Sequence, residues 1–530
     1  MTVELSQEQI SMTSEGLGES DAIYEDFSTA TNTSHEYELN SSESLTFLYN
    51  LLYDDKSTLT KADILSILNS LKERENELSF TFNDLWGYMN VQGVWMPPSL
   101  RRKFYTERSR VGRNSWFRNM PSSRQDAIEN VNLLSFHTRT EFFKFQTFYG
   151  KLKNHITHFQ LRNLVTCGEN LSNGIFYPSS YYHDGNLHTV SSDNAISHNS
   201  PESFHSFFKI NRLMPDDDDL SSRAMKLDCL VDSRQLPLSA NSRISSCASS
   251  NKFLVNGTFE GGYILSDISD PHDTKLLGEY TLTGSADGIT NHISISKDDR
   301  ELLISSNDKT IRVIDLARNI KKSSSKIPLA VNCSANSPTN KNQFFIIGDD
   351  SKAYIMDRRI LGKDFNPCIV FSGHKDYGFG CDWSPLDENL LLTGNQDGTV
   401  RLWDRRNPQE NLYCWSSSLG SQASSVSDEF LGGPVRNCKF SYNGTHIVWA
   451  ESLDHVGIIQ FSDLKKDYGD LQSRVQSIDF IGKCIGLNMC PADSGQGEEL
   501  IIGVNDCPLG GILTYQLEGI DKPLDFDFSF

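Results

Sequence analysis

Histidine, cysteine, serine and the carboxylates do most of the chemistry in proteins, and this sequence contains 13 His and 11 Cys. A nucleophilic site would need a histidine placed with a Ser, Cys or Asp, and a nucleotide site would need a glycine-rich phosphate loop. The sequence has no G-x-S-x-G, G-x-x-x-x-G-K-[ST] or H-E-x-x-H motif, and its histidines are scattered without a catalytic spacing. The glycine cluster GFGC at residues 378–381 leads into an expected strand and lacks a phosphate-binding turn. We therefore predict a protein that is not an enzyme and that needs no cofactor and no metal.

Composition narrows the range of partners and compartments. The chain has 530 residues, a net charge of −20 and 38% apolar residues, so it is too long for one ordinary core and low in apolar residues for a wholly folded chain. The negative charge disfavours binding to nucleic acid or to anionic membranes. No apolar run reaches the roughly 18 residues of a membrane span, and no Cys-x-x-Cys pair indicates zinc. Scattered cysteines and an N-terminus without signal-peptide features predict a cytoplasmic protein that can also be nuclear.

The most informative segment spans residues 372–407, SGHKDYGFGCDWSPLDENLLLTGNQDGTVRLWDRRN. Short apolar runs alternate in it with turn sequences, in the order GCDW, SPLDEN, LLLTG, NQDG and TVRLWD. This pattern predicts three or four short strands joined by tight turns. With Gly373-His374 near its start and Trp403-Asp404 near its end, the segment resembles a WD repeat.

The resemblance gives the polar residues of this repeat a structural role. In WD repeats a histidine, a hydroxyl, an aspartate and a tryptophan form a buried tetrad, and His374, Thr393, Asp397 and Trp403 occupy those positions here. The carboxylate is expected to accept from the imidazole, the imidazole to bond the hydroxyl, and the hydroxyl to bond the indole N–H. A satisfied buried network of this kind fixes one packing of the strands. His374 and Asp397 are therefore expected to hold the blade together and not to form a catalytic pair.

Weaker copies of the repeat flank the complete one. One keeps the turn residue Asp308 and places Ile314-Asp315 in the Trp-Asp position, and another places Met356-Asp357 there. Copies or fragments are expected in residues 155–165, 244–269, 292–316, 344–359, 436–464 and 479–517. We predict an all-β fold, a seven-bladed WD-repeat β-propeller over residues 130–519, with six and eight blades as alternatives. Residues 168–222, rich in Ser, Asn and His, are expected to be a long surface insertion and not a core element.

The N-terminal part differs in composition from the repeats. Residues 1–43 contain ten acidic residues and no Lys or Arg, which predicts a disordered acidic tail. Residues 44–129 are predicted to be a helical segment with a capping box at Thr60 and Asp63, which either packs on the main domain or docks a partner helix.

Within that helical segment, residues 101–124 hold eight basic residues, Glu107 as the only acidic one, and several aromatic residues. Basic residues interleaved with aromatic ones could bind single-stranded nucleic acid. Packing on an acidic surface of this protein or of a partner fits the net charge better, so nucleic acid is the less favoured alternative.

A protein without catalytic motifs is expected to bind other molecules. In a propeller, the loops that lead into the innermost strands converge on one mouth of the central channel. In the complete repeat this region carries Asp376, Tyr377 and Phe379, with Gln396 beside the tight turn. Exposed aromatic and amide groups there would suit an extended peptide. The alternative is that Tyr377 and Phe379 pack between blades.

Beyond the generic repeat, three segments resemble one branch of WD-repeat proteins found in fungi and plants: NLLSFHTRTEFFKFQ, THFQLRNLV and the complete repeat. In yeasts this branch is similar to WD-repeat substrate receptors of the glucose-induced-degradation (GID) ubiquitin ligase. The resemblance implies recognition of N-terminal degrons on target proteins that are then degraded by the proteasome. The ammonium group of such a degron would need a carboxylate at the channel mouth, and Asp376 is the candidate there. The resemblance also implies attachment to an armadillo-type scaffold subunit through C-terminal residues.

The C-terminal sequence PLDFDFSF fits such an attachment. In an extended strand Leu524, Phe526, Phe528 and Phe530 would share one face. Residues 520–530 are therefore predicted to be an aromatic docking tail. The alternative is that this tail packs against GGILTYQL and closes the last blade.

Two other functions remain open at this stage. Trp403-Asp404-Arg405-Arg406 resembles the W-D-x-R box of receptors for cullin-type ligases, and Met356-Asp357-Arg358-Arg359 is similar to it. A pure assembly scaffold without a role in degradation would need only the propeller. The subunits that co-purify with the chain would separate these readings.

Overall fold

The fold is taken from a computed structural model, which describes residues 44–73, 79–112, 142–150, 152, 163–168, 173–182, 206–215, 225–239, 242–361, 365–417, 433–464, 475–492 and 497–517. The predicted acidic tail at residues 1–43 and the predicted docking tail at residues 520–530 lie outside these ranges, as do residues 113–124 of the basic stretch. Within the described ranges, no helix is long and apolar enough to cross a membrane.

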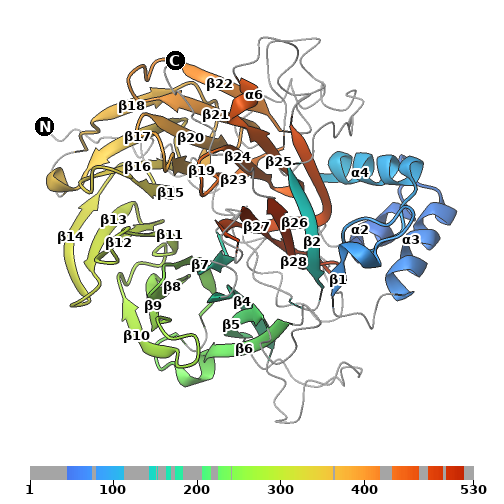
Figure 1. The fold of residues 1–530 in the computed structure, drawn as a ribbon, viewed down its shortest axis with the longest axis horizontal. Helices are drawn as coiled ribbons and strands as arrows, with labels where there is room; N and C mark the ends of the chain where they lie inside the picture. The colour runs from blue at the N-terminus through green and yellow to red at the C-terminus, as the bar shows by residue number, and fades with distance from the viewer. Residues whose placement is uncertain are drawn as a thin grey trace, which may run out of the picture.

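Antiparallel sheets follow one another around a central axis, as Figure 1 shows. Five of the sheets in the described chain have four strands each, and a further sheet has eight. The eight-stranded sheet is two blades joined by one long strand, β26 (Gln476–Pro491), because β26 pairs first with β25 and then with β27. The ring therefore has seven blades, and the predicted seven-bladed WD-repeat β-propeller is confirmed.

The first five blades are each built from four strands that follow one another in the sequence. Blade 1 contains β3 (Thr166–Cys167), β4 (Ile175–Tyr182), β5 (Ser206–Pro215) and β6 (Met225–Asp232). Blade 2 contains β7 (Ile244–Ser249), β8 (Phe253–Thr258), β9 (Gly262–Asp267) and β10 (Lys275–Thr281). Blade 3 contains β11 (Thr290–Ile295), β12 (Glu301–Ser306), β13 (Thr310–Asp315) and β14 (Ile320–Lys326). Blade 4 contains β15 (Val331–Asn336), β16 (Gln343–Gly348), β17 (Lys352–Asp357) and β18 (Ile369–Ser372). Blade 5 contains β19 (Gly378–Trp383), β20 (Leu390–Asn395), β21 (Thr399–Asp404) and β22 (Asn411–Ser416).

The last two blades share one sheet. Blade 6 contains β23 (Val435–Phe440), β24 (His446–Glu451), β25 (Leu453–Gln460) and the first residues of β26. Blade 7 contains the rest of β26, β27 (Glu498–Asn505), β28 (Gly511–Leu517) and β2 (Phe143–Tyr149). Short helical turns lie at α6 (Phe461–Leu464), η4 (Ser233–Gln235) and η5 (Arg358–Ile360).

The ring is closed by strands from opposite ends of the propeller. β2 precedes blade 1 in the sequence, yet it pairs with β28 of blade 7 in a register that sets Phe143 opposite Leu517. The short β1 (Phe80–Thr81) adds to the outer side of β2. The outermost strand of the last blade is thus supplied by the segment that comes before the first blade, so the ring is held shut by backbone hydrogen bonds.

Apolar runs explain why these segments become strands. All six residues of β20, LLLTGN, are buried, as are Leu302, Leu303 and Ile304 of β12. Continuous runs of this kind are typical of strands that are covered on both faces. Neighbouring blades also come very close at Gly380, where an added Cβ would lie 2.9 Å from Asn437 Cα. Glycine at this position lets β19 approach β23.

The N-terminal helical segment lies beside β1 and β2 on the outside of the ring (Figure 1). It contains α2 (Ser44–Leu51), α3 (Lys61–Glu73), η1 (Phe82–Asp84) and α4 (Pro98–Gly112). The predicted capping box is present at the start of α3, where Thr60 N donates to Asp63 Oδ2 at 2.9 Å and Asp63 N donates to Thr60 Oγ1 at 3.1 Å. The predicted N-terminal helices are therefore present as far as Gly112, and residues 113–129 of the predicted segment lie outside the described residues.

Polar and apolar contacts join this helical segment to blades 6 and 7. Gln92 Nε2 donates to the carbonyl oxygens of Ile481 and Leu509 at 2.9 and 2.7 Å, and Ile481 N donates back to Gln92 Oε1 at 2.6 Å. Phe104 is buried in one apolar cluster with Ile481 and Leu509. The helices pack on the propeller as part of the same structure.

The described half of the basic stretch packs on acidic residues of the propeller. Arg101 pairs with Asp479 at 3.2 Å and Arg108 with Asp454 at 2.6 Å. For Arg101 and Arg108 the structure thus shows the favoured expectation, packing on an acidic surface of this protein.

The expectation of an insertion across residues 168–222 needs a correction. Two strands of blade 1, β4 and β5, lie inside this range, and Phe176 and Ile210 of these strands are buried. A polar connection at residues 183–205, which lies outside the described residues, separates the two strands and hides their pairing in the sequence.

Candidate functional site

Four polar side chains meet in the interior of blade 5. His374 Nδ1 lies 3.1 Å from Asp397 Oδ2, and His374 Nε2 lies 2.7 Å from Thr393 Oγ1. Trp403 Nε1 donates to the same hydroxyl oxygen at 2.8 Å. With the imidazole proton on Nδ1, the imidazole donates to the carboxylate, and the hydroxyl donates to Nε2 while it accepts from the indole. The structure brings all four residues of the predicted tetrad together.

Asp397 stands in the tight turn between β20 and β21, where Gly398 has a φ of 78°. Its carboxylate also accepts from the backbone N–H groups of Lys375 and Thr399, each at 2.9 Å. Burial would raise the pKa of Asp397, but the imidazole of His374 and these donors outweigh it and lower the pKa to about 2. His374 is 7% exposed and Asp397 2%. A buried pair with all its bonds made inside the blade has no access to a substrate, so its role is structural.

In blade 3, a different set of residues stabilises the corresponding tight turn. Its turn residue Asp308 accepts from Arg312 Nη2 at 2.6 Å, and Arg312 Nη1 donates to Ser306 Oγ at 2.9 Å. The arginine is 5% exposed. A buried Arg–Asp pair thus takes the place of the histidine network in this weaker repeat.

A cavity of about 1500 Å³ occupies the central channel and spreads over the adjoining face of blade 3, as far as Asp315 on β13 and Lys322 on β14. All seven innermost strands contribute to it; examples are Thr166 (β3), Cys247 (β7), His292 (β11), Ser334 (β15), Asp382 (β19), Asn437 (β23) and Asn488 (β26). The cavity extends to the loops that follow these strands, at Lys297, Ser337, Pro385 and Ser441. It therefore reaches the end of the channel at which the inner strands finish.

The predicted substrate-binding residues lie at the other end, where β19 begins. Phe379 lines the cavity, where the guanidinium of Arg436 lies 4.2 Å from its ring centroid. Asp376, Tyr377 and Gln396 are not among the described residues that line it. Asp376 and Gln396 are 4% and 6% exposed, and Tyr377 is 39% exposed. The structure therefore brings only Phe379 of this group into the cavity.

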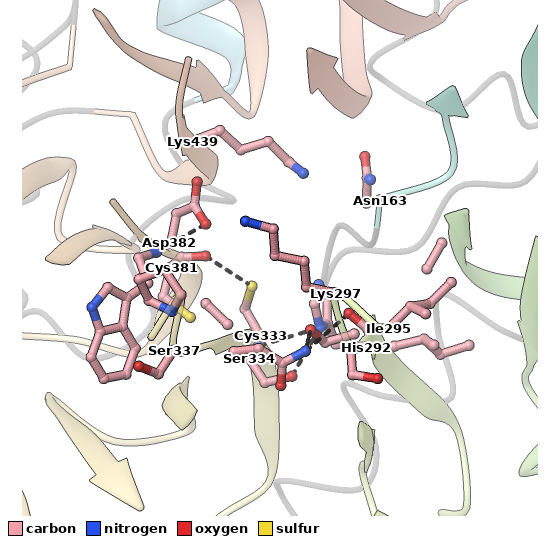
Figure 2. A pocket seen from close by; sticks show the side chains of 18 of the residues that line it. Asn163, His292, Ile295, Lys297, Cys333, Ser334, Ser337, Cys381, Asp382 and Lys439 are labelled. Carbon is pink, nitrogen blue, oxygen red and sulfur yellow. Dashed lines mark hydrogen bonds between the residues drawn. The ribbon is translucent and has the colours of Figure 1, made fainter. Parts of the chain in front are cut away.

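The wall of the cavity is ordered by hydrogen bonds between neighbouring blades, some of which are drawn in Figure 2. Cys333 Sγ donates to the carbonyl oxygen of Cys381 at 3.5 Å, and His292 Nδ1 lies 3.1 Å from Ser334 Oγ. Asp382 Oδ2 accepts from Phe440 N at 2.9 Å. These bonds join blade 3 to blade 4, blade 4 to blade 5, and blade 5 to blade 6.

Asp382 is the carboxylate that faces the cavity from blade 5 (Figure 2). Its Oδ1 accepts from Trp383 N at 2.9 Å. Burial raises the pKa of Asp382 to about 6, while the nearby ammonium of Lys439 acts in the opposite direction. The group is mostly ionised at neutral pH and can accept from a positively charged ligand group.

Sequence reasoning missed Lys297, Asp382 and Lys439 as site residues. They belong to three different blades and approach one another only when the ring closes. The sequence feature that could have identified them is that each lies near or just after the C-terminal end of an innermost strand. That feature is visible only when the weaker repeats are aligned strand by strand.

The W-D-x-R sequence of blade 5 forms a local ion pair. Arg406 Nε and Nη2 donate to the two carboxylate oxygens of Asp404 at 3.0 and 2.6 Å, and Arg406 N donates to Asp404 Oδ1 at 2.8 Å. The same three bonds occur between Asp357 and Arg359 in blade 4. They occur again between Asp232 and Arg234 in blade 1, where no tryptophan precedes the aspartate. The Asp-x-Arg pair is thus a repeated turn element of this propeller.

Other expected sites can be placed only in part. No group of three or more His, Cys, Asp or Glu residues in the described chain could hold a metal ion. The predicted tail residues, Leu524, Phe526, Phe528 and Phe530, lie outside the described residues.

Comparisons with known proteins match two segments of the chain to a repeat family. The family model "WD domain, G-beta repeat" matches residues 278–315 and 365–404, the second of which contains the tetrad. WD-40 repeat-containing protein MSI4 of Arabidopsis thaliana is 44% identical over 73 residues, which are 14% of each chain. Histone acetyltransferase type B subunit 2 of Neurospora crassa is 35% identical over 81 residues, covering 14% of this chain and 18% of that protein.

Two further matches are more distant. The ribosome biogenesis protein WDR12 homolog of Trichoplax adhaerens is 27% identical over 140 residues, covering 26% of this chain and 31% of that protein. These three relatives are therefore matched over less than a third of their own length. A chain from a crystal structure of the mitotic checkpoint complex superposes with a TM-score of 0.45 and 13% identity, covering 73% of this chain and 98% of that one.

Proposed function

Because this chain is a WD40-repeat protein, we propose that it is a non-catalytic substrate receptor of a GID-type ubiquitin ligase. WD40-repeat proteins are generally scaffolds without catalysis, and this one is a protein-interaction module. In the proposed role it recruits target proteins through their N-terminal segments for proteasomal degradation, in the cytoplasm or also in the nucleus. The sequence resemblance described above supports the ligase assignment.

The observation that carries the receptor role is the cavity in the central channel. Its volume of about 1500 Å³ exceeds the roughly 300–1000 Å³ of most small-molecule sites. Side chains of all seven inner strands face it, so it is a built feature of the closed ring. A cavity of this size suits several residues of an extended peptide better than one small ligand.

An N-terminal degron needs a carboxylate for its ammonium group. Asp382 faces the cavity, whereas Asp376 is buried just before β19 and is not among the lining residues. We therefore assign the ammonium-binding role to Asp382 in place of Asp376. The aromatic segment at residues 524–530 is proposed to dock onto the armadillo-type scaffold subunit, because alternate apolar side chains can fill pockets along a groove.

Affinity purification of the tagged full chain from its native cells tests the ligase assignment. Mass spectrometry of the co-purifying proteins should identify the armadillo-type scaffold and the catalytic subunits of a GID-type ligase. Recovery of a cullin with its propeller adaptor, or of an assembly without ligase subunits, would contradict the proposal.

A cullin-type ligase receptor is the second candidate. The side chain of Arg406 is 55% exposed and so could contact an adaptor. However, the same Asp-x-Arg pair occurs in blades 1 and 4. This recurrence is expected of a residue pair that stabilises a turn, whereas an adaptor-binding site would be needed in one blade alone. Under this second reading, Arg406→Ala would remove the cullin adaptor from the purified complex, and Arg234→Ala, the matched change in blade 1, would not.

An assembly subunit without a role in degradation is the third candidate. The similarity to a histone acetyltransferase type B subunit 2 supports it, since that protein's name describes a subunit of an enzyme complex. The same purification distinguishes this candidate by the absence of ligase subunits.

A further inference from the structure

The cavity in the central channel carries an excess of positive charge in a strongly acidic protein. Eight of its lining residues are basic: Lys297, Arg300, Lys322, Lys341, Arg358, Arg359, Arg436 and Lys439. Four are acidic: Asp298, Glu301, Asp315 and Asp382. The whole chain has a net charge of −20, so this balance is the reverse of the protein's average.

The acidic lining residues of blade 3 are already engaged by part of the basic set. Glu301 pairs with Arg358 at 2.6 Å and with Lys322 at 2.7 Å. Asp315 lies 3.7 Å from Lys322, and Asp298 lies 3.6 Å from Arg300. Ion pairs within the wall therefore account for these three carboxylates.

Three lysines remain without such a pair. Lys297 follows β11, Lys341 follows β15, and Lys439 lies on β23, so they come from blades 3, 4 and 6. No ion pair joins any of them to a carboxylate in the described part of the chain; Lys439 Nζ donates to Asn488 Oδ1 at 3.5 Å, and its charge acts on the nearby carboxylate of Asp382. Figure 2 shows Lys297 and Lys439 extending from different blades into the same open space. Like charges that converge repel one another, and a bound anion would relieve that repulsion.

The deep part of the cavity adds a cationic and aromatic surface. The guanidinium of Arg436 lies over the ring of Phe379 at 4.2 Å from the centroid. Phe379 is 7% exposed. A side chain that enters this part of the channel meets positive charge and an aromatic edge together.

We propose that the cavity binds an acidic peptide segment, whose Asp or Glu side chains pair with Lys297, Lys341 and Lys439. The inference deepens the proposed function and rests on it, in that the bound segment belongs to the target protein. The volume of about 1500 Å³ favours a peptide over a single small anion. A nucleic acid is disfavoured because the net charge of −20 repels its phosphates outside the cavity.

Fluorescence anisotropy with the full chain tests the proposal. The probe is a fluorescein-labelled decapeptide of alternating Glu and Ser, and its control is the same peptide with Gln in place of Glu. We expect the Glu peptide to bind and its affinity to fall as salt increases, because the contacts are ionic. The Gln peptide should bind at least about tenfold more weakly.

Substitutions in the wall locate the binding. The double variant Lys297→Ala with Lys439→Ala should weaken binding of the Glu peptide by roughly tenfold. The matched control is Lys326→Ala on the outer strand β14, an exposed lysine outside the lining of the cavity, and it should leave the affinity unchanged. Both lysines of the double variant are at least partly exposed, and circular dichroism of each variant verifies that it is folded.

Three results would overturn the proposal. These are no binding of the Glu peptide, equal binding of the Glu and Gln peptides, and an unchanged affinity in the folded double variant. The test is separable from that of the ligase assignment. Ligase subunits that co-purify with a chain unable to bind the Glu peptide would refute only the acidic-segment inference. Peptide binding by a chain that recovers no ligase would refute only the receptor assignment.

Discussion

Arg108 of α4 and Asp454 of β25 form a two-pronged ion pair across the junction between the helical segment and blade 6. Arg108 Nε donates to Asp454 Oδ2 at 2.6 Å, and Nη2 donates to Oδ1 at 2.7 Å. The arginine side chain is 3% exposed, and the carboxylate also accepts from Gly482 N at 2.8 Å. One buried arginine therefore connects the helices to two strands of the ring.

We expect Arg108→Ala to destabilise the protein by about 3–5 kcal/mol, because it leaves a carboxylate buried without its counter-charge. Urea denaturation followed by circular dichroism measures the free energy of unfolding. Arg102→Ala on the exposed side of α4 is the matched control and should change it by no more than about 0.5 kcal/mol. Equal stabilities of the two variants would show that the Arg108–Asp454 pair does not stabilise the protein.

The tetrad of blade 5 gives a second stability prediction. Trp403→Ala should cost roughly 3–5 kcal/mol, since it removes a fully buried aromatic side chain and leaves the Thr393 hydroxyl without its indole donor. Trp86→Ala is the control, because Trp86 is 65% exposed. A melting temperature of Trp403→Ala equal to that of the wild type would refute the tetrad's structural role.

His455 predicts how stability depends on pH. Its Nδ1 lies 2.9 Å from Asp479 Oδ1 and its Nε2 lies 3.7 Å from Glu451 Oε1. Burial lowers the pKa of His455, but the charges of Glu451 and Asp479 outweigh this and raise it above the usual value. The stabilisation is therefore fully present below the unfolded pKa of about 6.5 and is lost as pH rises through the folded pKa.

The measurement is the free energy of unfolding of wild type and His455→Gln between about pH 6 and pH 9. The wild type should lose stability over this range, and the variant should lose less. Burial also raises the pKa of Glu498 to about 7. This shift too makes the free energy of unfolding fall as pH rises, so His455→Gln should keep part of the pH dependence. Identical slopes in the two proteins would contradict the role of His455.

Deletion of residues 524–530 tests the proposed docking segment. Each buried Phe is worth about 1.5–3 kcal/mol of transfer free energy, so the loss of three should abolish association with the ligase scaffold. The melting temperature of the propeller should stay nearly unchanged. A large fall in melting temperature, with scaffold binding intact after correction for folded protein, would instead favour the alternative that the segment closes the last blade.

The tetrad could be predicted from the sequence because its four residues lie within one repeat and match a known spacing. The cavity could not, since its lysines and Asp382 come from different repeats and are brought together only by blade packing. Strands β4 and β5 were hidden for a related reason. A long polar connection separates them, so the short-range alternation that indicates a hairpin is missing. The pairing of β2 with β28 could not be predicted either, because no local pattern in FKFQTFY indicates that it pairs with a strand near the other end of the repeats.

The pairing of β2 with β28 imposes a delay during synthesis, because β2 is made long before the strand with which it pairs. The outer strand of blade 7, β2, is synthesised before the other strands of the ring, and its partner β28 is the last strand of the described chain. At about 5–20 residues per second, β2 emerges roughly 20–75 s before β28 exists. During that interval its apolar residues and unpaired backbone groups are open to chaperones and to other nascent chains. A pause in translation within the repeats would lengthen this exposure, whereas one before β2 would not. The nascent chain therefore cannot complete its ring until almost all of its blades have been made.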